Sequence, residues 1–294
     1  MEVFRRTDVM TNTKKKYLNM KFFFITIALI IVSINMVGQN IEPMSAYTKR
    51  VQENRSKAKV KEERMYIFPI DKKENAKKND SLRSEIFFNE FGKPLKSTSY
   101  FPDMTIINET EYDLKGNELK MINKDGNGNV KQTIVYEYNH DNSLSKVKYF
   151  NASGELTSTK NSKEELENGY KLTRNTKGEV VSKTYSNYDS QKRIYISRLL
   201  KPDDEIRYEN KYLLDDKMLI LEWTITDNIQ NRKSKTVFKY DDYGNKTDEF
   251  KYDSNGNLTD KIIYVYDDKN LLSKSYWYQP ADKLKQISKY IFVF

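Results

Sequence analysis

Turn-forming residues recur at an even spacing along the chain, and this spacing constrains the fold more than any other feature. Beyond residue 80, Gly or Asn recurs in steps of 12 or 14 residues or sums of those steps. The clearest turn positions are Gly116, Gly128, Asn142, Gly154, Gly178, Gly244, Gly256 and Asn270. The interval from Gly178 to Gly244 divides into the same steps and predicts further turns at Lys192, Asp204, Met218 and Gln230. We therefore expect an internal repeat of about 26 residues, made of two strands and two turns.

The segments between the turns read as half-buried β-strands, because apolar and polar residues alternate in them. Since steps of 12 and 14 are even, we expect the even-numbered rings to return to one side of the sheet. These rings are Tyr136, Tyr138, Phe238, Tyr240, Phe250, Tyr252, Tyr264, Tyr266, Tyr276 and Tyr278. About sixteen strands exceed the ~10 that an open twisted sheet holds without curling.

The predicted fold class is therefore all-β. We expect an antiparallel β-hairpin meander of about 26-residue repeats, curled into an open tube or spiral sheet. The aromatic side is expected to turn inward, because an open aromatic face would be a large exposed apolar patch.

Tyr-Asp pairs stand before several turns, as in "YDSNGNLT" and "YVYDDKNLLSKSYWY". This pattern resembles the YD repeats of the RHS family, with the best matches at 240–245, 252–258 and 266–271 and partial matches at 112–117 and 188–189. The resemblance covers residues 85–290 and implies a spiral β-sheet, which in large members encloses a toxin or serves surface attachment. This chain is far shorter than such shells, and it looks similar to short exported YD-repeat proteins of Bacteroidota-type bacteria.

The N-terminal sequence has the features of an export signal. The apolar run 22–37 follows several lysines, and it is short for a spanning helix but suits a secretory signal peptide. We predict a signal peptide over 1–38, with 1–19 as a misannotated extension if Met20 is the true start. An uncleaved N-terminal anchor is the alternative and the only membrane contact expected. Residues 39–80 are predicted to form a charged helix and linker, and residues 81–294 the YD-like β-repeat domain.

The amino-acid composition excludes several kinds of functional site. The absence of Cys excludes disulfides, thiolate metal sites and a cysteine nucleophile, and the single His140 excludes histidine clusters. Residues 1–38 hold six basic and two acidic residues, so their removal lowers the formal charge from +9 to about +5. We therefore expect no nucleic-acid partner. No nucleophile, base and orienting group occur together, so we predict no enzymatic activity and no cofactor.

The turn "DSNGNL" at 253–258 has the alternating side-chain oxygens of a calcium loop. Such a loop needs Gly at its sixth position and a bidentate Glu at its twelfth. Those positions hold Leu258 and Tyr264. Asp and Asn side chains bond to their own turn backbone instead, and Gly adopts the positive φ that the turn needs. No metal site is predicted.

Trp223 and Trp277 are the candidate binding residues, together with Tyr276 and Tyr278 beside the second tryptophan. Being odd-numbered, the tryptophans are expected to leave the aromatic face and project from the polar one, where a flat ring offers contact area at low entropic cost. The alternative is that the N-terminal segment or a neighbouring strand covers them.

The predicted function is that of an exported, non-catalytic β-repeat protein: a binding scaffold at the bacterial cell envelope or outside it, whether periplasmic, at the cell surface or secreted. Its partner would be an unidentified protein or peptide. One alternative is a glycan-binding envelope module. The other is an outer-membrane β-barrel, against which the lack of a continuous apolar band outside the aromatic face speaks.

Overall fold

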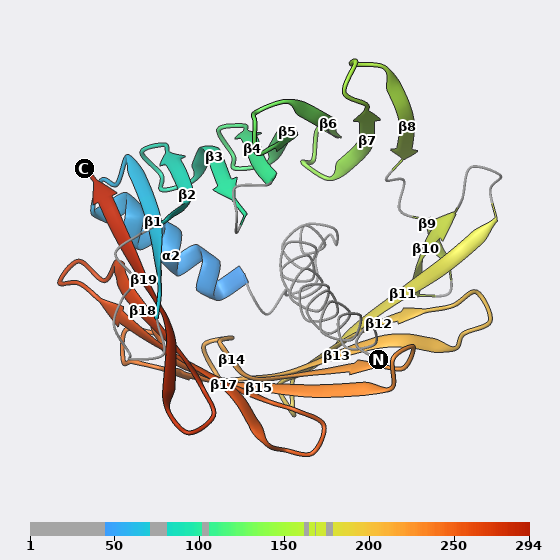
Figure 1. Cartoon of the computed structure of the whole chain (residues 1–294). Helices are drawn as coiled ribbons and strands as arrows, with labels where there is room; N and C mark the ends of the chain where they lie inside the picture. The colour runs from blue at the N-terminus through green and yellow to red at the C-terminus, as the bar shows by residue number, and fades with distance from the viewer. Residues whose placement is uncertain (1–44, 71–80, 102–105, 162–164, 168, 175–178) are drawn as a thin grey trace, which may run out of the picture.

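The computed structural model describes residues 45–70, 81–101, 106–161, 165–167, 169–174 and 179–294 (Figure 1). The predicted fold class is confirmed: nineteen strands form one antiparallel sheet that curls around the single described helix, α2 (Ser45–Lys57). The predicted signal peptide lies outside the described residues. No described helix is long and apolar enough to cross a membrane.

The strands follow one another along the chain, with short turns between most of them. They are β1 (Glu62–Pro69), β2 (Ser81–Phe88), β3 (Pro94–Tyr100), β4 (Ile106–Tyr112), β5 (Glu118–Asp125), β6 (Val130–Tyr138), β7 (Leu144–Phe150), β8 (Leu156–Asn161), β9 (Glu165–Glu167), β10 (Tyr170–Arg174), β11 (Val180–Asp189), β12 (Ile194–Leu200), β13 (Ile206–Leu214), β14 (Ile220–Asp227), β15 (Arg232–Tyr240), β16 (Lys246–Tyr252), β17 (Leu258–Tyr266), β18 (Leu272–Gln279) and β19 (Lys283–Val293).

Strand β1 corrects the predicted start of the β domain. It lies within the segment 39–80, which was predicted to be a charged helix and linker, and it pairs with both β19 and β2. The sheet therefore begins at Glu62 rather than at residue 81. The apolar run "MYIFP" belongs to this strand, but it is short and is followed by a lysine-rich segment, so the sequence pattern did not identify it as a strand.

The hairpin turns follow the predicted chemistry. At 241–245 the Asp241 N–H donates to the Asn245 carbonyl (2.9 Å), the Asn245 N–H donates to Asp241 Oδ1 (2.8 Å), and Gly244 has φ +77°. Asp113, Asp125, Asp253 and Asp267 bind their own turns in the same way. The carboxylate of "DSNGNL" is thus engaged by its own backbone.

The turns predicted in the middle of the chain are also present. Asp204 and Met218 have positive φ as predicted, whereas the other two positive-φ residues are Arg193 and Asn231, one residue later than predicted. In those two hairpins the loop has four residues, as the pairs Asp189↔Ile194 and Asp227↔Arg232 show.

A β-bulge beside most turns corrects the prediction that the even-numbered rings share one side. Residues directly opposite each other lie on the same face. In β15–β16 the pair Phe238↔Glu249 precedes a register shift that leaves Thr247 without an opposite residue. This extra residue makes even positions of one strand face odd positions of the next. The prediction is wrong: Phe238 and Tyr264 lie on one face, and Phe250 and Tyr276 on the other.

A tyrosine before the turn ties successive hairpins together. Tyr240 Oη donates to the carbonyl of Ile220 (2.9 Å), and Tyr266 Oη donates to the carbonyl of Lys246 (3.0 Å). Both bonds span 20 residues of sequence. The Tyr-Asp pair therefore has two tasks, since the Tyr links hairpins and the Asp shapes the turn.

The concave face of the sheet is the side that carries Glu63, Glu249 and Tyr264 and on which α2 lies (Figure 1). Its buried residues form two small cores. Val60, Phe88 and Leu271 pack together beyond the C-terminal end of α2. Tyr195, Leu214 and Ile220 form the second core further along the sheet. The opposite, convex face has no described segment over it (Figure 1).

The sheet stays open between β8 and β9 (Figure 1). All pairings from β8 through β2, β1 and β19 to β9 are antiparallel, so an odd number of strands makes β8 and β9 run in the same direction. Parallel neighbours need a crossover of a dozen or more residues, whereas β8 ends at Asn161 and β9 begins at Glu165. Among the described residues, no strand pairing joins β8 to β9.

Replacing Gly92 by Ala is expected to detach α2. A Cβ at this position, where φ is +70°, would lie 2.2 Å from the backbone oxygen of Gln52. Gly256→Ala is the matched control, because its φ is +80° and nothing lies within 4 Å of the added Cβ. The left-handed conformation costs an Ala about 1–2 kcal/mol at either site. We expect Gly92→Ala to lower the free energy of unfolding further and to speed trypsin cleavage within α2. Equal losses in denaturant melts and unchanged cleavage would contradict the close contact.

Candidate binding site on the concave face

Polar contacts hold helix α2 on the concave face. Arg55 Nη2 lies 2.7 Å from Glu63 Oε2, and the Arg55 guanidinium lies 4.6 Å from the centre of the Phe88 ring. Asn54 Nδ2 donates to the carbonyl of Asn270 (3.1 Å), and Ser56 Oγ donates to the carbonyl of Glu90 (2.8 Å). The concave face therefore binds a charged helix through an ion pair, a cation–π contact and hydrogen bonds.

A buried carboxylate lies beside the N-terminal half of α2. Glu249 is 9% exposed and is bound by Lys246 Nζ (2.9 Å), Lys251 Nζ (3.3 Å) and Tyr264 Oη (2.9 Å). Burial by itself would raise the pKa of Glu249, but the two ammonium groups and the hydrogen bonds lower this pKa to about 2. Lys246 also lies 5.8 Å from the ring centre of Tyr47 in α2. The carboxylate is thus ionised and fixed at neutral pH.

The tyrosines around this carboxylate remain protonated donors. Burial raises the pKa of Tyr240, Tyr264 and Tyr266, and it raises the pKa of Tyr290 to about 12. Tyr47 of α2 adds a hydrogen bond to Tyr266 that raises its pKa further. Their hydroxyl groups therefore keep the same hydrogen-bonding role throughout the physiological pH range.

Further along the concave face, four aromatic residues form a ladder across β11 to β14. The aromatic ladder consists of Tyr188, Tyr195, Tyr212 and Trp223, which lie directly opposite one another in successive strands. The Tyr212 and Trp223 rings are stacked at 5.7 Å with an interplanar angle of 13°, and Tyr195 and Tyr212 are tilted at 5.9 Å. Tyr195 is buried in the second core, whereas the other three rings are half-buried.

Polar groups lie next to the ladder on the same face. Trp223 Nε1 donates to Asn210 Oδ1 (3.1 Å), and Ser197 lies opposite Asn210 in the neighbouring strand. Ser197 is in turn 3.4 Å from Ser186 through their hydroxyl oxygens. Stacked rings with amide and hydroxyl groups beside them can bind a polypeptide or a sugar.

The four residues predicted from the sequence do not form one site. Trp223 and Trp277 both lie on the concave face, but in β14 and β18, roughly 19 Å apart at ~4.8 Å per strand. Tyr276 and Tyr278 lie on the convex face. The expectation that the tryptophans leave the aromatic face is wrong for Trp223, because the bulges bring it beside Tyr212. Trp277 Nε1 donates to Asp260 Oδ1 (2.7 Å). A binding role for these four residues stays a prediction.

Sequence reasoning missed the other members of the ladder. In the sequence, Tyr188 belongs to the partial Tyr-Asp match at 188–189, and the turn spacing does not single out Tyr195 or Tyr212. The signal that would have found them is the pairing rule itself. Once opposite residues are known to alternate between odd and even numbers, Tyr188, Tyr195, Tyr212 and Trp223 fall on one line.

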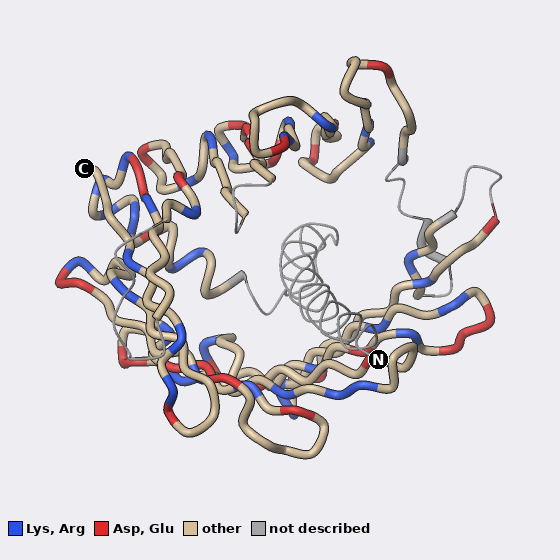
Figure 2. The backbone as a smooth tube through the Cα atoms, in the orientation of Figure 1, with Lys and Arg blue, Asp and Glu red and all other residues tan. Residues whose placement is uncertain are grey.

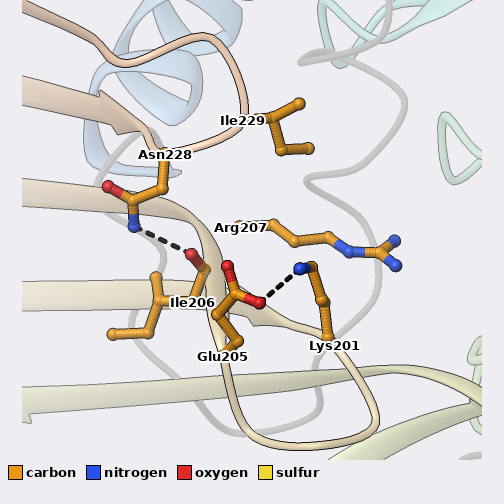
Figure 3. A pocket seen from close by; sticks show the side chains of 6 residues that line it. All are labelled: Lys201, Glu205, Ile206, Arg207, Asn228 and Ile229. Carbon is orange, nitrogen blue, oxygen red and sulfur yellow. Dashed lines mark hydrogen bonds and ion pairs between the residues drawn. The ribbon is translucent and has the colours of Figure 1, made fainter.

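A shallow hollow of about 420 Å³ lies at the turns that join β12 to β13 and β14 to β15 (Figure 3). Its lining includes Arg207 and Ile229, and two polar contacts stabilise it: Lys201 with Glu205, and Asn228 Nδ2 with the carbonyl of Ile206 (2.8 Å). Among the described residues, no group of His, Cys, Asp or Glu is arranged to hold a metal ion.

Glu249→Gln is expected to make the stability of the fold less dependent on acid pH. The folded-state pKa of about 2 lies below the ordinary value of 4.5, so the stability that Glu249 contributes is present above pH 4.5 and lost as the pH falls toward 2. We expect the variant to lose up to about 3 kcal/mol at neutral pH and to show a flatter profile between these values. Urea melts at a series of pH values measure both effects. Glu137→Gln, at an exposed ion pair with Lys148, should change little; equal effects in the two variants would contradict the role of burial.

No family model matches the sequence, and no curated protein matches it. Among solved structures, the chain is similar to a porin-like protein from Bacteroides uniformis, with 8% identity and a TM-score of 0.39 over 80% of this chain and 98% of that one. It is also similar to a porin-like protein from Bacteroides vulgatus, with 10% identity and a TM-score of 0.34 over 80% and 98% of the two chains. A LolA superfamily protein from Nitrosomonas europaea has 11% identity and a TM-score of 0.25 over 84% and 91%. TM-scores this low do not establish a common fold.

Proposed function

We propose that this chain is an exported, non-catalytic scaffold that binds a polypeptide on its concave face. The observation that carries the proposal is the way in which the face already holds α2. A charged helix is bound there by the Arg55–Glu63 ion pair, by hydrogen bonds to turn carbonyls and by contacts of Lys246 and Tyr266 with Tyr47. The same face therefore has the chemistry needed to bind another polar segment. The apolar run 22–37 supports export.

The aromatic ladder is the proposed contact surface for that segment. Trp and Tyr are enriched among the residues that dominate binding energy at protein interfaces, because large rigid rings bury much area at low entropic cost. Trp223 and Tyr212 are half-buried, with Asn210 beside them to bond a peptide group. The opening between β8 and β9 leaves a side of the curl by which an extended chain enters.

Glycan binding is the second candidate function. The nearly parallel rings of Tyr212 and Trp223 stack on each other, so the outer face of the stack can serve as a flat platform, and the Asn210 amide lies at the edge of the indole ring. A sugar ring stacks on such a platform while its hydroxyl groups bond to the amide.

We also propose that the chain is related to the RHS-type YD repeats that its sequence resembles. The support comes from the hydrogen bonds of the Tyr-Asp pairs and not from overall similarity to a solved structure. The Tyr of the pair bonds to a carbonyl 20 residues earlier, and the Asp binds its own turn, so both letters of the motif have a task.

The test is selection of random peptides displayed on phage against the full chain, followed by calorimetric measurement of the selected peptides. We expect Trp223→Ala to weaken peptide binding more than tenfold, because removal of a central aromatic residue from an interface typically costs ~2 kcal/mol or more. Tyr252→Ala on the convex face is the matched control and should leave the affinity unchanged.

A photo-reactive phenylalanine analogue locates the bound peptide. It should cross-link the peptide from Ser186 but not from Asn187, because these neighbours in β11 face opposite sides of the sheet. Selected peptides that bind the wild type and Trp223→Ala equally would overturn the concave site. A glycan array in which binding is lost in Trp223→Ala, with no peptide selected, would favour the second candidate instead.

A further inference from the structure

The convex face of β17, β18, β19 and β1 carries a row of apolar and aromatic side chains. Ile263 lies opposite Tyr276, Tyr276 opposite Ile287, and Ile287 opposite Phe68. These four residues are called the convex row. They come from both ends of the described chain and meet because β1 pairs with β19. No described segment lies over them (Figure 1).

Lysines surround the convex row on the same face. They are Lys233, Lys235 and Lys239 of β15, Lys261 of β17, Lys274 of β18 and Lys289 of β19, and all but Lys261 are exposed. Within β15 to β19, the acidic residue that lies on this face is Asp248, opposite Lys239. Lys235 and Lys261 have long ion pairs with Glu222 (3.7 Å) and Asp282 (3.8 Å). The face is therefore predominantly positive.

The excess of positive charge is local to this part of the sheet. Lys and Arg alternate with Asp and Glu around the curl as a whole (Figure 2). On the convex face of β4 to β7, acidic residues match the lysines, as in the pairs Lys124–Glu109 and Lys148–Glu137. The nearby turn carboxylates of Asp241, Asp253 and Asp267 are bound to their own turn backbones.

The lysines of this face also pack on aromatic rings. Lys235 lies 5.5 Å from the ring centre of Tyr252, and Lys239 lies 5.3 Å from that of Phe250. Lys261 lies 5.8 Å from the ring centre of Tyr278. A long side chain that covers apolar surface with its stem and presents an ammonium group outward suits a boundary between apolar and aqueous phases, and so does the amphipathic tyrosine ring.

We propose that this convex face, from β15 to β19 with Phe68 of β1, docks on a membrane surface rich in anionic phospholipids. The lysines match the phosphate groups by charge, and the convex row with its tyrosines matches the boundary between headgroups and acyl chains. Six adjacent strands at ~4.8 Å span roughly 24 Å, so many headgroups contact the face at once. The concave site faces away from this surface, so membrane docking leaves it accessible to a partner.

The experiment uses the full mature chain and sedimentation with vesicles. We expect binding to phosphatidylcholine vesicles that contain phosphatidylglycerol, little binding to pure phosphatidylcholine, and weakening as salt is raised. The triple variant Lys239→Gln, Lys274→Gln and Lys289→Gln should weaken partitioning roughly 100-fold, at roughly fivefold for each lysine. Lys96→Gln, Lys120→Gln and Lys146→Gln change the same charge on another part of the convex face and should have little effect.

Other outcomes of the same experiment would overturn the proposal. These are equal loss in the two triple variants, absence of binding to either vesicle, and binding to soluble heparin without binding to vesicles.

Tyr276→Trp gives an independent readout, because its fluorescence should be quenched by brominated lipids in anionic vesicles. Peptide binding on the concave face should persist in all these variants, so failure here is distinguishable from failure of the proposed scaffold function.

Discussion

The strand register is the constraint on which the rest of the structure depends. In every hairpin with a described register, an odd-numbered residue lies opposite an even-numbered one away from the turn. Five-residue loops reach this register with a bulge, as at Thr247, and four-residue loops reach it without one. A given face therefore returns only after two strands, or about 26 residues. That is why adjacent residues such as Tyr276 and Trp277 belong to surfaces with different chemistry, and why the unit of the fold is a hairpin rather than a strand.

The turns could be predicted from the sequence, and the bulges could not. The turns at Asp204 and Met218 follow from the regular spacing of the other turns, which can be counted along the chain without knowing which residues pair across the sheet. Each bulge lies at a fixed distance from its turn, but the residue type at the bulge varies. The bulge residues include Thr259, Ser273, Leu221, Lys131 and Arg207. Thr259 and Ser273 bond to carbonyls eight residues earlier, a signal too common to identify alone. The ladder and β1 were missed for a related reason, since their partners are distant in sequence.

Strand β1 determines whether the sheet can close, because its presence sets whether the total number of strands is odd or even. The runs β2–β8 and β9–β19 both hold an odd number of antiparallel strands, and β1 pairs between them, so the total is odd. The odd total leaves β8 and β9 running in the same direction, with too few residues between them for a parallel crossover. The curl therefore stays open. An open curl leaves a gap at the side of its concave face, whereas a closed sheet would be open only at its two ends.

Two surfaces of opposite character follow from one register. On the concave face the charged residues beside α2 are buried in pairs, as with Glu249 and Lys246, so the cost of desolvation is offset locally and the surface presents aromatic rings and amides. On the convex face of β15 to β19 all the lysines named above except Lys261 are exposed. A slip of one residue would exchange these sets and bring Lys261 and Lys274 into the concave side, where the buried partner Glu249 is already bound by two lysines. The bulge position is therefore held by the chemistry of both faces at once, which explains how it stays fixed while its residue type varies.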